Sequence, residues 1–244
     1  VKPDFFNKEK GNYLELFKKS TSNNKFLIAG ILKSDGNKEE VLAVFDRLLQ
    51  ADSAEPSIYL SRGNYYTNKI RDFKLAINDY RKAIMLDSTN VDAWYFAGNT
   101  SFNLKSYTNA EAYFDVVEKL QPDKKETYLN RGMAKAHQRK FRQAIQDYSK
   151  AISLDEKWYS AYVNRGLTFI NLKVYDTAII DLKKAVSLDP ENFEAHFYLG
   201  NCHRFIKDFK NAMLEYQNAI KYNPNYSPAY LGRGLMFLAE GKKA

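Results

Sequence analysis

The sequence predicts an all-α protein, a solenoid in which helix-turn-helix repeats stack one upon the next. Three columns of residues recur every 34 positions, and a fixed period of this length is typical of stacked helical repeats. One column consists of glycines, one of alanines and one of aromatic residues. The columns are Gly98, Gly132, Gly166, Gly200 and Gly234; Ala110, Ala144, Ala178 and Ala212; and Tyr107, Phe141, Tyr175 and Phe209.

Each repeat is expected to contain two amphipathic helices. In the repeat that begins at Tyr159, apolar residues recur twice at helical spacing. Pro122, Pro190 and Pro224 stand at equivalent points after the second helix, which a proline cannot continue. We expect the glycines and alanines to lie where helix axes approach closely, with the aromatic column filling the space beside them. One repeat cannot bury both of its faces, so neighbouring repeats must stack.

These residues resemble a known family. The strings Tyr162-Val163-Asn164-Arg165-Gly166, Ala178 through Ala185 and Leu188-Asp189-Pro190 are similar to the tetratricopeptide repeat. The resemblance covers residues 56–244 and is specific because the motif recurs in register. It implies a right-handed α-α superhelix whose first helices line a concave surface, and a non-catalytic scaffold that binds another protein there.

The domain organisation follows from the period. We expect residues 1–55 to form divergent N-terminal capping helices or a degenerate repeat, continuous with residues 56–244. In the degenerate repeat, Val41, Phe45 and Leu48 resemble the buried face of a second helix, and residues 11–20 would add a capping helix. The other segments are repeats 1 to 5 at 56–90, 91–124, 125–158, 159–192 and 193–226, followed by one further first helix from Ser227 to Glu240.

Repeat 1 has one residue more than the others. Gly63 lies 35 positions before Gly98, whereas Ala76 lies 34 before Ala110. We expect the extra residue in the turn between the two helices of this repeat.

Composition excludes several classes of protein. The chain of 244 residues is 45% hydrophobic and 15% aromatic, unlike disordered sequences. Cys202 is the single cysteine and cannot form an internal disulfide. No run approaches the ~18 consecutive apolar residues of a transmembrane helix. Since the sequence begins at Val1, we expect it to be the soluble, cytoplasmic or periplasmic side of a larger or processed protein.

No pattern of catalytic, metal-binding or cofactor-binding residues is present. The sequence lacks a phosphate-binding glycine loop and any zinc-spaced set of cysteines and histidines, so we expect no metal, no cofactor and no enzyme. His196 occupies the aromatic place that Tyr128 and Tyr162 hold in other repeats, and His203 also falls in a packed column. Cys202 is expected to be a small buried residue. A Cys202 and His203 pair is a poor nucleophile, because adjacent helical residues point about 100° apart.

The resemblance identifies the partner-binding face. First-helix residues that point away from their own second helix would contact an extended peptide or a helix of the partner. Asparagine is frequent among them although it is a mediocre helix former, and its amide can pair with the N–H and C=O groups of a peptide backbone. The predicted residues are Asn64, Tyr95, Phe96, Asn99, Phe102, Asn103, Asn130, Met133, His137, Asn164, Asn171, Phe197, Tyr198, Asn201, Arg204 and Phe205.

One known activity of the family is not supported. Co-chaperones of this family hold acidic tails with a clamp of Lys, Asn, Asn, Lys and Arg, but Tyr95, Ser160 and Asn164 stand here at cationic places. Arg62, Arg131, Arg165 and Arg233 precede the small glycine in four first helices. Their recurrence favours a structural role, in which they pair with a neighbouring aspartate.

Two alternatives stay open. The net charge is +8, and a basic edge formed by Lys135, Arg139, Lys140 and Arg142 would attract an acidic partner or, as a less favoured reading, nucleic acid. The segment from Leu231 to Leu238 has no second helix after it in this sequence, so its apolar face would support self-association.

Overall fold

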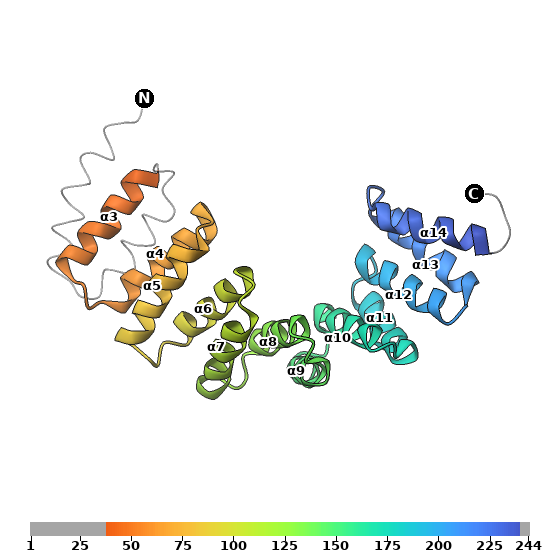
Figure 1. Ribbon diagram of the computed structural model, residues 1–244, viewed down its shortest axis with the longest axis horizontal. Helices are drawn as coiled ribbons and strands as arrows, with labels where there is room; N and C mark the ends of the chain where they lie inside the picture. Colours follow the sequence, from red (N-terminus) through yellow and green to blue (C-terminus); the bar gives the residue numbers. More distant parts are fainter. Residues whose placement is uncertain (1–37, 240–244) are drawn as a thin grey trace, which may run out of the picture. The chain divides into compact units, whose positions relative to one another are not determined.

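The computed structural model describes residues 38–239, and every regular element in that range is helical (Figure 1). This confirms the predicted all-α repeat fold. In chain order the elements are α3 (Lys38–Ala51), α4 (Pro56–Tyr65), the π-helical turn η1 (Tyr66–Ile70), α5 (Phe73–Leu86), α6 (Val91–Asn103), α7 (Tyr107–Leu120), α8 (Lys125–His137), α9 (Phe141–Leu154), α10 (Tyr159–Asn171), α11 (Tyr175–Leu188), α12 (Phe193–Phe205), α13 (Phe209–Tyr222) and α14 (Ser227–Ala239).

Contacts divide the chain into two compact bodies with a boundary between Leu120 and Gln121. The N-terminal body includes α3 to α7, and the C-terminal body includes α8 to α14. Repeats 1 to 5 each hold one helix pair, from α4 and α5 in repeat 1 to α12 and α13 in repeat 5. Inside each body, a second helix packs both on its own first helix and on the first helix that follows.

The C-terminal body has a further layer of contacts. Helix α8 touches α10, α10 touches α12, and α12 touches α14. First helices of successive repeats therefore lie side by side in this body, and residues at equivalent places on them can act together.

Helix α3 packs on α4, the first helix of repeat 1. Val41, Phe45 and Leu48 are buried, as expected for such a face, and they pack with Ile58 and Tyr65 of α4. The predicted boundary at residue 55 thus lies inside the N-terminal body. The expected capping helix at 11–20 lies outside the described residues.

The glycine column lies where the two helices of a repeat approach most closely. A Cβ atom added to Gly132 would come 2.6 Å from Cε1 of Tyr148, and one added to Gly98 would come 2.6 Å from Cε1 of Phe114. A real Cβ cannot approach that closely. Beside Gly63, Gly98, Gly132, Gly166 and Gly200 the bulky residue comes from the middle of the second helix, so our expectation that Tyr107, Phe141, Tyr175 and Phe209 fill this space is wrong. Tyr107 instead contacts Phe102, at the end of the first helix of its own repeat. Tyr175 contacts Phe205, at the end of the first helix of the following repeat.

The extra residue of repeat 1 lies within its first helix. The N–H of Asp72 donates to the carbonyl of Tyr66, six residues back, whereas the matching bond in repeat 3 joins Lys140 to Lys135, five residues back. The π-helical turn η1 absorbs the additional residue before the chain turns at Arg71. The inter-helix turn itself is unchanged, which corrects the prediction.

Candidate functional site

The third residue after the start of each first helix makes the same hydrogen bond in every repeat. Its side chain, through a tyrosine hydroxyl or a ring nitrogen, bonds to the backbone carbonyl six residues earlier, at 2.7 to 3.3 Å. His196 belongs to this column, since its Nε2 lies 3.0 Å from the carbonyl of Pro190. The six pairs are Tyr59 and Ser53, Trp94 and Ser88, Tyr128 and Pro122, Tyr162 and Glu156, His196 and Pro190, and Tyr230 and Pro224.

His196 differs from the tyrosines in having a carboxylate partner. Its Nδ1 lies 2.6 Å from Oε2 of Glu215, and its ring stacks on Tyr222. Burial on its own would lower the pKa of His196, but the hydrogen bonds to Glu215 and to the Pro190 carbonyl outweigh it, and the pKa is raised. Both ring nitrogens face acceptors, so the geometry suits the doubly protonated imidazolium. His196 is therefore an internal structural group.

Cys202 and His203 do not form a reactive pair. Cys202 is fully buried, and burial raises the pKa of its thiol to about 12, so the thiolate nucleophile is scarce at neutral pH. His203 is also buried and turns its Nδ1 toward Oδ2 of Asp208, at 3.1 Å. The structure places both residues in the packed interior of repeat 5, as the repeat pattern predicted.

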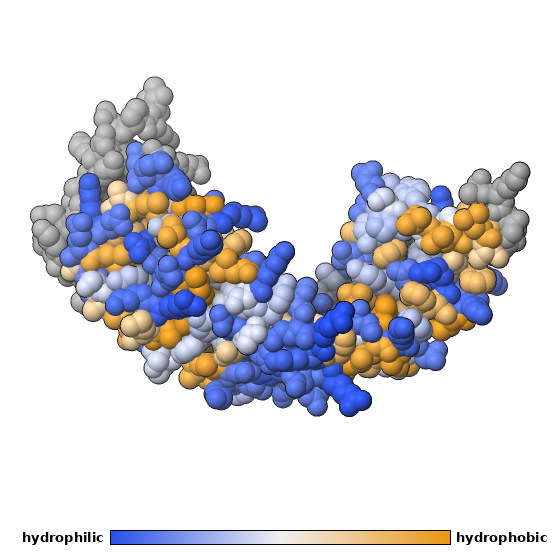
Figure 2. All heavy atoms as spheres, in the orientation of Figure 1, coloured by the Kyte–Doolittle hydropathy of each residue, from blue (hydrophilic) through white to orange (hydrophobic). Residues whose placement is uncertain are grey.

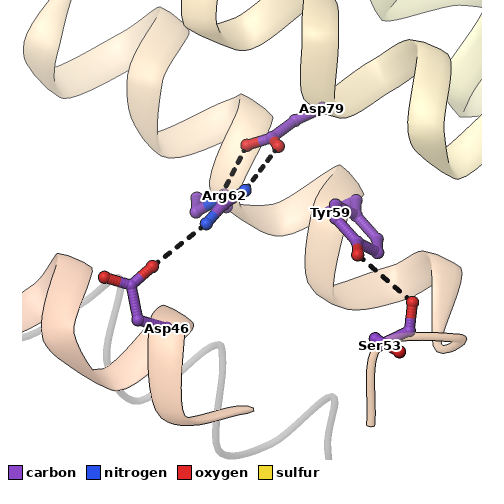
Figure 3. Close-up of polar contacts among 5 residues, drawn as sticks. All are labelled: Asp46, Ser53, Tyr59, Arg62 and Asp79. Atoms are coloured by element: carbon purple, nitrogen blue, oxygen red, sulfur yellow. Dashed lines mark hydrogen bonds and ion pairs between the residues drawn. The ribbon is translucent and has the colours of Figure 1, made fainter. Parts of the chain in front are cut away.

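Pairs of an arginine and a buried aspartate join the two helices of three repeats. Arg62 binds both carboxylate oxygens of Asp79 at 2.8 Å and also reaches Asp46 of α3 at 3.2 Å (Figure 3). Arg165 makes the matching bidentate contact with Asp181 and donates to Ser149 Oγ of the preceding second helix. Each arginine thus links three successive helices. The third pair is Arg131 and Asp147.

Two of the predicted partner-binding asparagines make hydrogen bonds between the two helices of their own repeats. The hydroxyl of Tyr80 donates to Oδ1 of Asn64, and the hydroxyl of Tyr216 donates to Oδ1 of Asn201, each at 2.8 Å. In both cases the tyrosine is the bulky residue beside the glycine column. One acceptor site of each amide oxygen is therefore used inside the repeat.

Asn130 and Asn164 occupy a different place. They stand at the same position of α8 and α10, two helices that contact each other, and both are half-buried. Nδ2 of Asn164 donates to the carbonyl of Ser160, one turn earlier in its own helix, at 2.9 Å. This bond fixes the amide plane and leaves Oδ1 without a donor among the described residues. Asn171 and Asn103 are exposed at the ends of α10 and α6.

Most of the predicted aromatic residues are packed between helices. Tyr95 contacts Phe114, Phe96 contacts Tyr80, and Phe197 contacts Tyr216, at 5.8 to 6.1 Å between ring centroids. Tyr95, Phe96 and Phe197 are half-buried. So are five further predicted residues: Tyr198, Phe102, Asn99, Met133 and Arg204.

Phe205 is the exception among these rings. It is 45% exposed at the end of α12, with one side stacked on Tyr175 at 4.7 Å and the guanidinium of Arg204 at 4.4 Å from its centroid. His137 is exposed at the matching place of α8. The ends of α8, α10 and α12 thus present His137, Asn171 and Phe205 to solvent.

The basic edge is smaller than predicted. Lys135 is half-buried and pairs with Asp147 at 2.8 Å, so it belongs to the internal ion-pair network. Arg139, Lys140 and Arg142 are exposed, and the surface over α8 and α9 is largely hydrophilic in the view of Figure 2.

Arg139 also belongs to a basic column. The residue at positive φ that ends each first helix is always a lysine or an arginine: Arg71, Lys105, Arg139, Lys173 and Lys207. Positive charge at a helix C-terminus is favourable, which gives this column a structural reason.

Within residues 38–239 no group of His, Cys, Asp and Glu side chains could hold a metal ion. None of the helices described there combines the length and the apolar character that crossing a membrane requires.

These contacts define a helical-repeat protein whose first helices carry a mixed amide and aromatic surface. Models of the tetratricopeptide repeat match residues 69–125, 126–157, 159–192 and 193–226. The chain belongs to the tetratricopeptide repeat family. Members of this family bind other proteins and are typically non-catalytic. No curated protein sequence matches the chain.

Solved structures with the same fold cover most of the chain. YrrB, described as "a TPR protein with an unusual peptide-binding site", has a TM-score of 0.64 at 20% identity, over 78% of this chain and 97% of its own. MamA from Desulfovibrio magneticus RS-1 has a TM-score of 0.66 at 20% identity, over 70% and 96%. A chain of the APC/C hetero-tetramer Cut9-Hcn1 has a TM-score of 0.65 at 16% identity, over 93% of this chain and 45% of its own. At these identities the likeness shows the fold alone.

Proposed function

We propose that this protein is a non-catalytic scaffold that holds a segment of a partner protein on the inner face of its C-terminal body. The inner face is defined here by Asn130, Asn164, Tyr198 and Asn201 together with His137, Asn171 and Phe205. These residues lie on α8, α10 and α12, which contact one another. The family supports binding of another protein, and YrrB provides an example of a peptide-binding member.

The observation that carries the proposal is the fixed amide of Asn164 beside Asn130. Because Nδ2 of Asn164 is held by Ser160, its Oδ1 is oriented to accept one N–H from a partner backbone. Asn130 stands one repeat earlier at the same place, so an extended peptide that pairs with Asn164 and crosses both helices would also pass Asn130. Backbone pairing of this kind gives affinity without demanding a particular partner sequence.

The exposed ends of the same helices would supply selectivity. Phe205 offers an apolar contact with a neighbouring guanidinium from Arg204. An aromatic or aliphatic partner side chain fits against Phe205, and an acidic one fits against Arg204. We therefore favour a partner segment that is apolar with an acidic residue nearby.

Mutation of the two asparagines tests this proposal. Peptides selected against the chain from a random library would be measured by calorimetry with Asn130→Ala/Asn164→Ala. Loss of two hydrogen bonds weakens binding by about tenfold or more. The matched control is Gln143→Ala/Gln146→Ala, which removes two exposed amides from the second helix α9. If both double variants weaken peptide binding equally, or if Asn130→Ala/Asn164→Ala does not weaken it, the inner face is not the binding site.

A second candidate function uses the basic edge. Arg139 and Arg142 are exposed and have no described acidic partner, so an acidic protein segment or nucleic acid is attracted there. Affinity for generic RNA measured between low and moderate salt separates the two functions. Binding to phosphates falls steeply with salt, whereas binding to the inner face does not.

A further inference from the structure

The turns between the two helices of repeats 3, 4 and 5 hold basic residues that their backbone does not favour. Arg139, Lys173 and Lys207 have φ angles of 60°, 60° and 64°, a region that suits glycine and that other side chains rarely adopt. All three side chains are exposed. The favourable charge at the helix C-terminus offsets part of this cost, but a basic residue in the last helical turn would supply that charge without a positive φ. The backbone therefore does not explain why these places are basic.

The next residue in two of these turns is also disfavoured locally. Val174 is the N-cap residue of α11 and Lys140 is that of α9, and neither side chain caps its helix. At the same place in repeat 5, the side chain of Asp208 accepts a hydrogen bond from the N–H of Asn211. Serine and aspartate are favoured at N-caps, and a lysine there brings positive charge to the positive end of the helix dipole. Local helix stability thus accounts for neither Val174 nor Lys140.

These turns lie along one edge of the C-terminal body. Helices α8, α10 and α12 contact one another and are first helices of successive repeats, so the turns that follow them stand in a row. The ring of Phe205, at the end of α12, stacks on Tyr175, at the start of α11, and so joins two of the turns. Val174 and Ile206 are 44% and 42% exposed on this edge. Basic and apolar side chains therefore face solvent together.

The edge is positively charged as a whole. Its three segments, 137–143, 171–177 and 205–211, contain six basic and two acidic residues, a net charge of +4 with histidine counted as neutral. One of the acidic residues, Asp208, accepts a hydrogen bond from Nδ2 of Asn211. The basic residues at positive φ form no ion pair with any other residue that the structure describes. An anionic partner is thus attracted to this edge.

We propose that the turn edge of the C-terminal body binds the surface of a membrane that contains anionic lipids. The turn edge is defined by Arg139, Lys140, Lys173, Val174, Ile206 and Lys207. The basic side chains pair with phosphate and carboxylate groups of the lipid heads, while Val174 and Ile206 enter the boundary of the acyl chains.

A membrane fits this edge better than another polyanion does. A flat surface can touch a row of turns at the ends of neighbouring helices at once. Nucleic acid would also attract the basic residues, but its phosphates offer no apolar contact to Val174 and Ile206. The membrane site is separate from Asn130 and Asn164 and goes beyond the function proposed above.

Binding to lipid vesicles tests the charged part of the site. The full 244-residue chain should bind vesicles of phosphatidylcholine mixed with phosphatidylserine, and should bind phosphatidylcholine alone far more weakly. Arg139→Gly/Lys173→Gly/Lys207→Gly should weaken binding about fiftyfold or more, since each basic residue near an anionic surface contributes about fivefold. Glycine suits the positive φ of all three places, so this variant should unfold close to the temperature of the parent chain. No binding to the mixed vesicles, or equal binding to both kinds, overturns the proposal.

A control variant removes the same charge elsewhere. Lys183→Gln/Lys184→Gln/Lys221→Gln changes three exposed lysines of the second helices α11 and α13. These lysines do not belong to the turn edge, so the control should weaken vesicle binding less than about fivefold. Equal weakening by the two triple variants would show that net charge alone attracts the chain, and would overturn the proposal.

The apolar side chains distinguish a membrane from another polyanion. Val174→Ser/Ile206→Ser should weaken vesicle binding about fivefold or more, because it removes the groups that enter the acyl boundary. Serine at position 174 supplies the missing N-cap of α11, which favours the folded state. The control Ile180→Ser, at a 67% exposed residue of α11, should leave vesicle binding unchanged. If Val174→Ser/Ile206→Ser binds vesicles as tightly as the parent chain, the proposal is overturned, and the basic residues then belong to a site for nucleic acid or an acidic protein.

Discussion

Both carboxylate oxygens of Asp181 accept hydrogen bonds from Arg165, at 2.7 and 2.8 Å, and the third nitrogen of that guanidinium donates to Ser149. One side chain thus joins α9, α10 and α11. The predicted structural role of the arginine column is confirmed in three repeats. Stacking in this chain is then held by specific ion pairs as well as by apolar area.

Removing Arg165 should be strongly destabilising. Arg165→Ala leaves the buried carboxylate of Asp181 without its partner, which costs about 3 kcal/mol of unfolding free energy. Chemical denaturation measures this change. The control Arg142→Ala, at an exposed residue in the first turn of α9, should change stability by less than about 0.5 kcal/mol. If Arg165→Ala/Asp181→Ala is less stable than Arg165→Ala alone, the pairing does not explain the cost.

Two glycines of one column should respond in opposite ways to alanine. Gly132→Ala forces a methyl group to within 2.6 Å of the buried ring of Tyr148 and should cost about 2 kcal/mol. Gly234→Ala meets open space in a helix and should stabilise the chain by about 0.5 to 1 kcal/mol. Thermal unfolding should therefore show a lower melting temperature for Gly132→Ala and a higher one for Gly234→Ala than for the parent chain. Similar destabilisation by both would contradict the packing described for this column.

The His196 and Glu215 pair should make stability depend on pH. The pKa of His196 is raised above 6.5 in the folded chain, so the folded state holds the proton more tightly than the unfolded state. The contribution of the His196 and Glu215 pair to the free energy of unfolding is fully present below pH 6.5. It is lost as the pH rises through the pKa of His196 in the folded chain. Unfolding free energy should fall over that window. In His196→Tyr, whose hydroxyl copies the bond made by Tyr162, the fall should vanish, and a fall of the same size in this variant would show that another group is responsible.

Cys202 should be silent in the native protein. With a pKa of about 12 and no exposed surface, its thiol should react with a disulfide reagent more than about 100-fold slower in the folded chain than in denaturant. Stopped-flow absorbance measures both rates. Comparable rates in the two states would mean that the interior of repeat 5 opens readily.

The sequence alone predicts the repeat boundaries well, because the columns are set by contacts inside each repeat. Helices α4, α6, α8, α10, α12 and α14 begin at the residues expected. It predicts the space beside the glycines poorly, because Tyr80, Phe114 and Leu182 vary in type and their role depends on which helix they oppose. For the same reason it did not separate Asn64, which holds Tyr80, from Asn164, whose carbonyl oxygen is open.

The extra residue of repeat 1 shows another limit. The spacing shows that the extra residue lies between Gly63 and Ala76. Backbone hydrogen bonds determine whether that residue forms a π-helical turn at the end of the first helix or lengthens the loop between the helices. The bond from Asp72 to Tyr66 decides this. Local spacing therefore fixes the register of a helix pair without fixing its detailed backbone.

Hydrogen exchange on the complex with a selected peptide tests most directly whether the inner face holds the partner. Amides of α8, α10 and α12 should exchange more slowly in the complex, centred on Asn130, Asn164 and Phe205, while those of the second helices α9 and α11 should be unchanged. Added protection confined to α9 and α11, or to the turn at Arg139 and Arg142, would contradict a partner bound on the inner face.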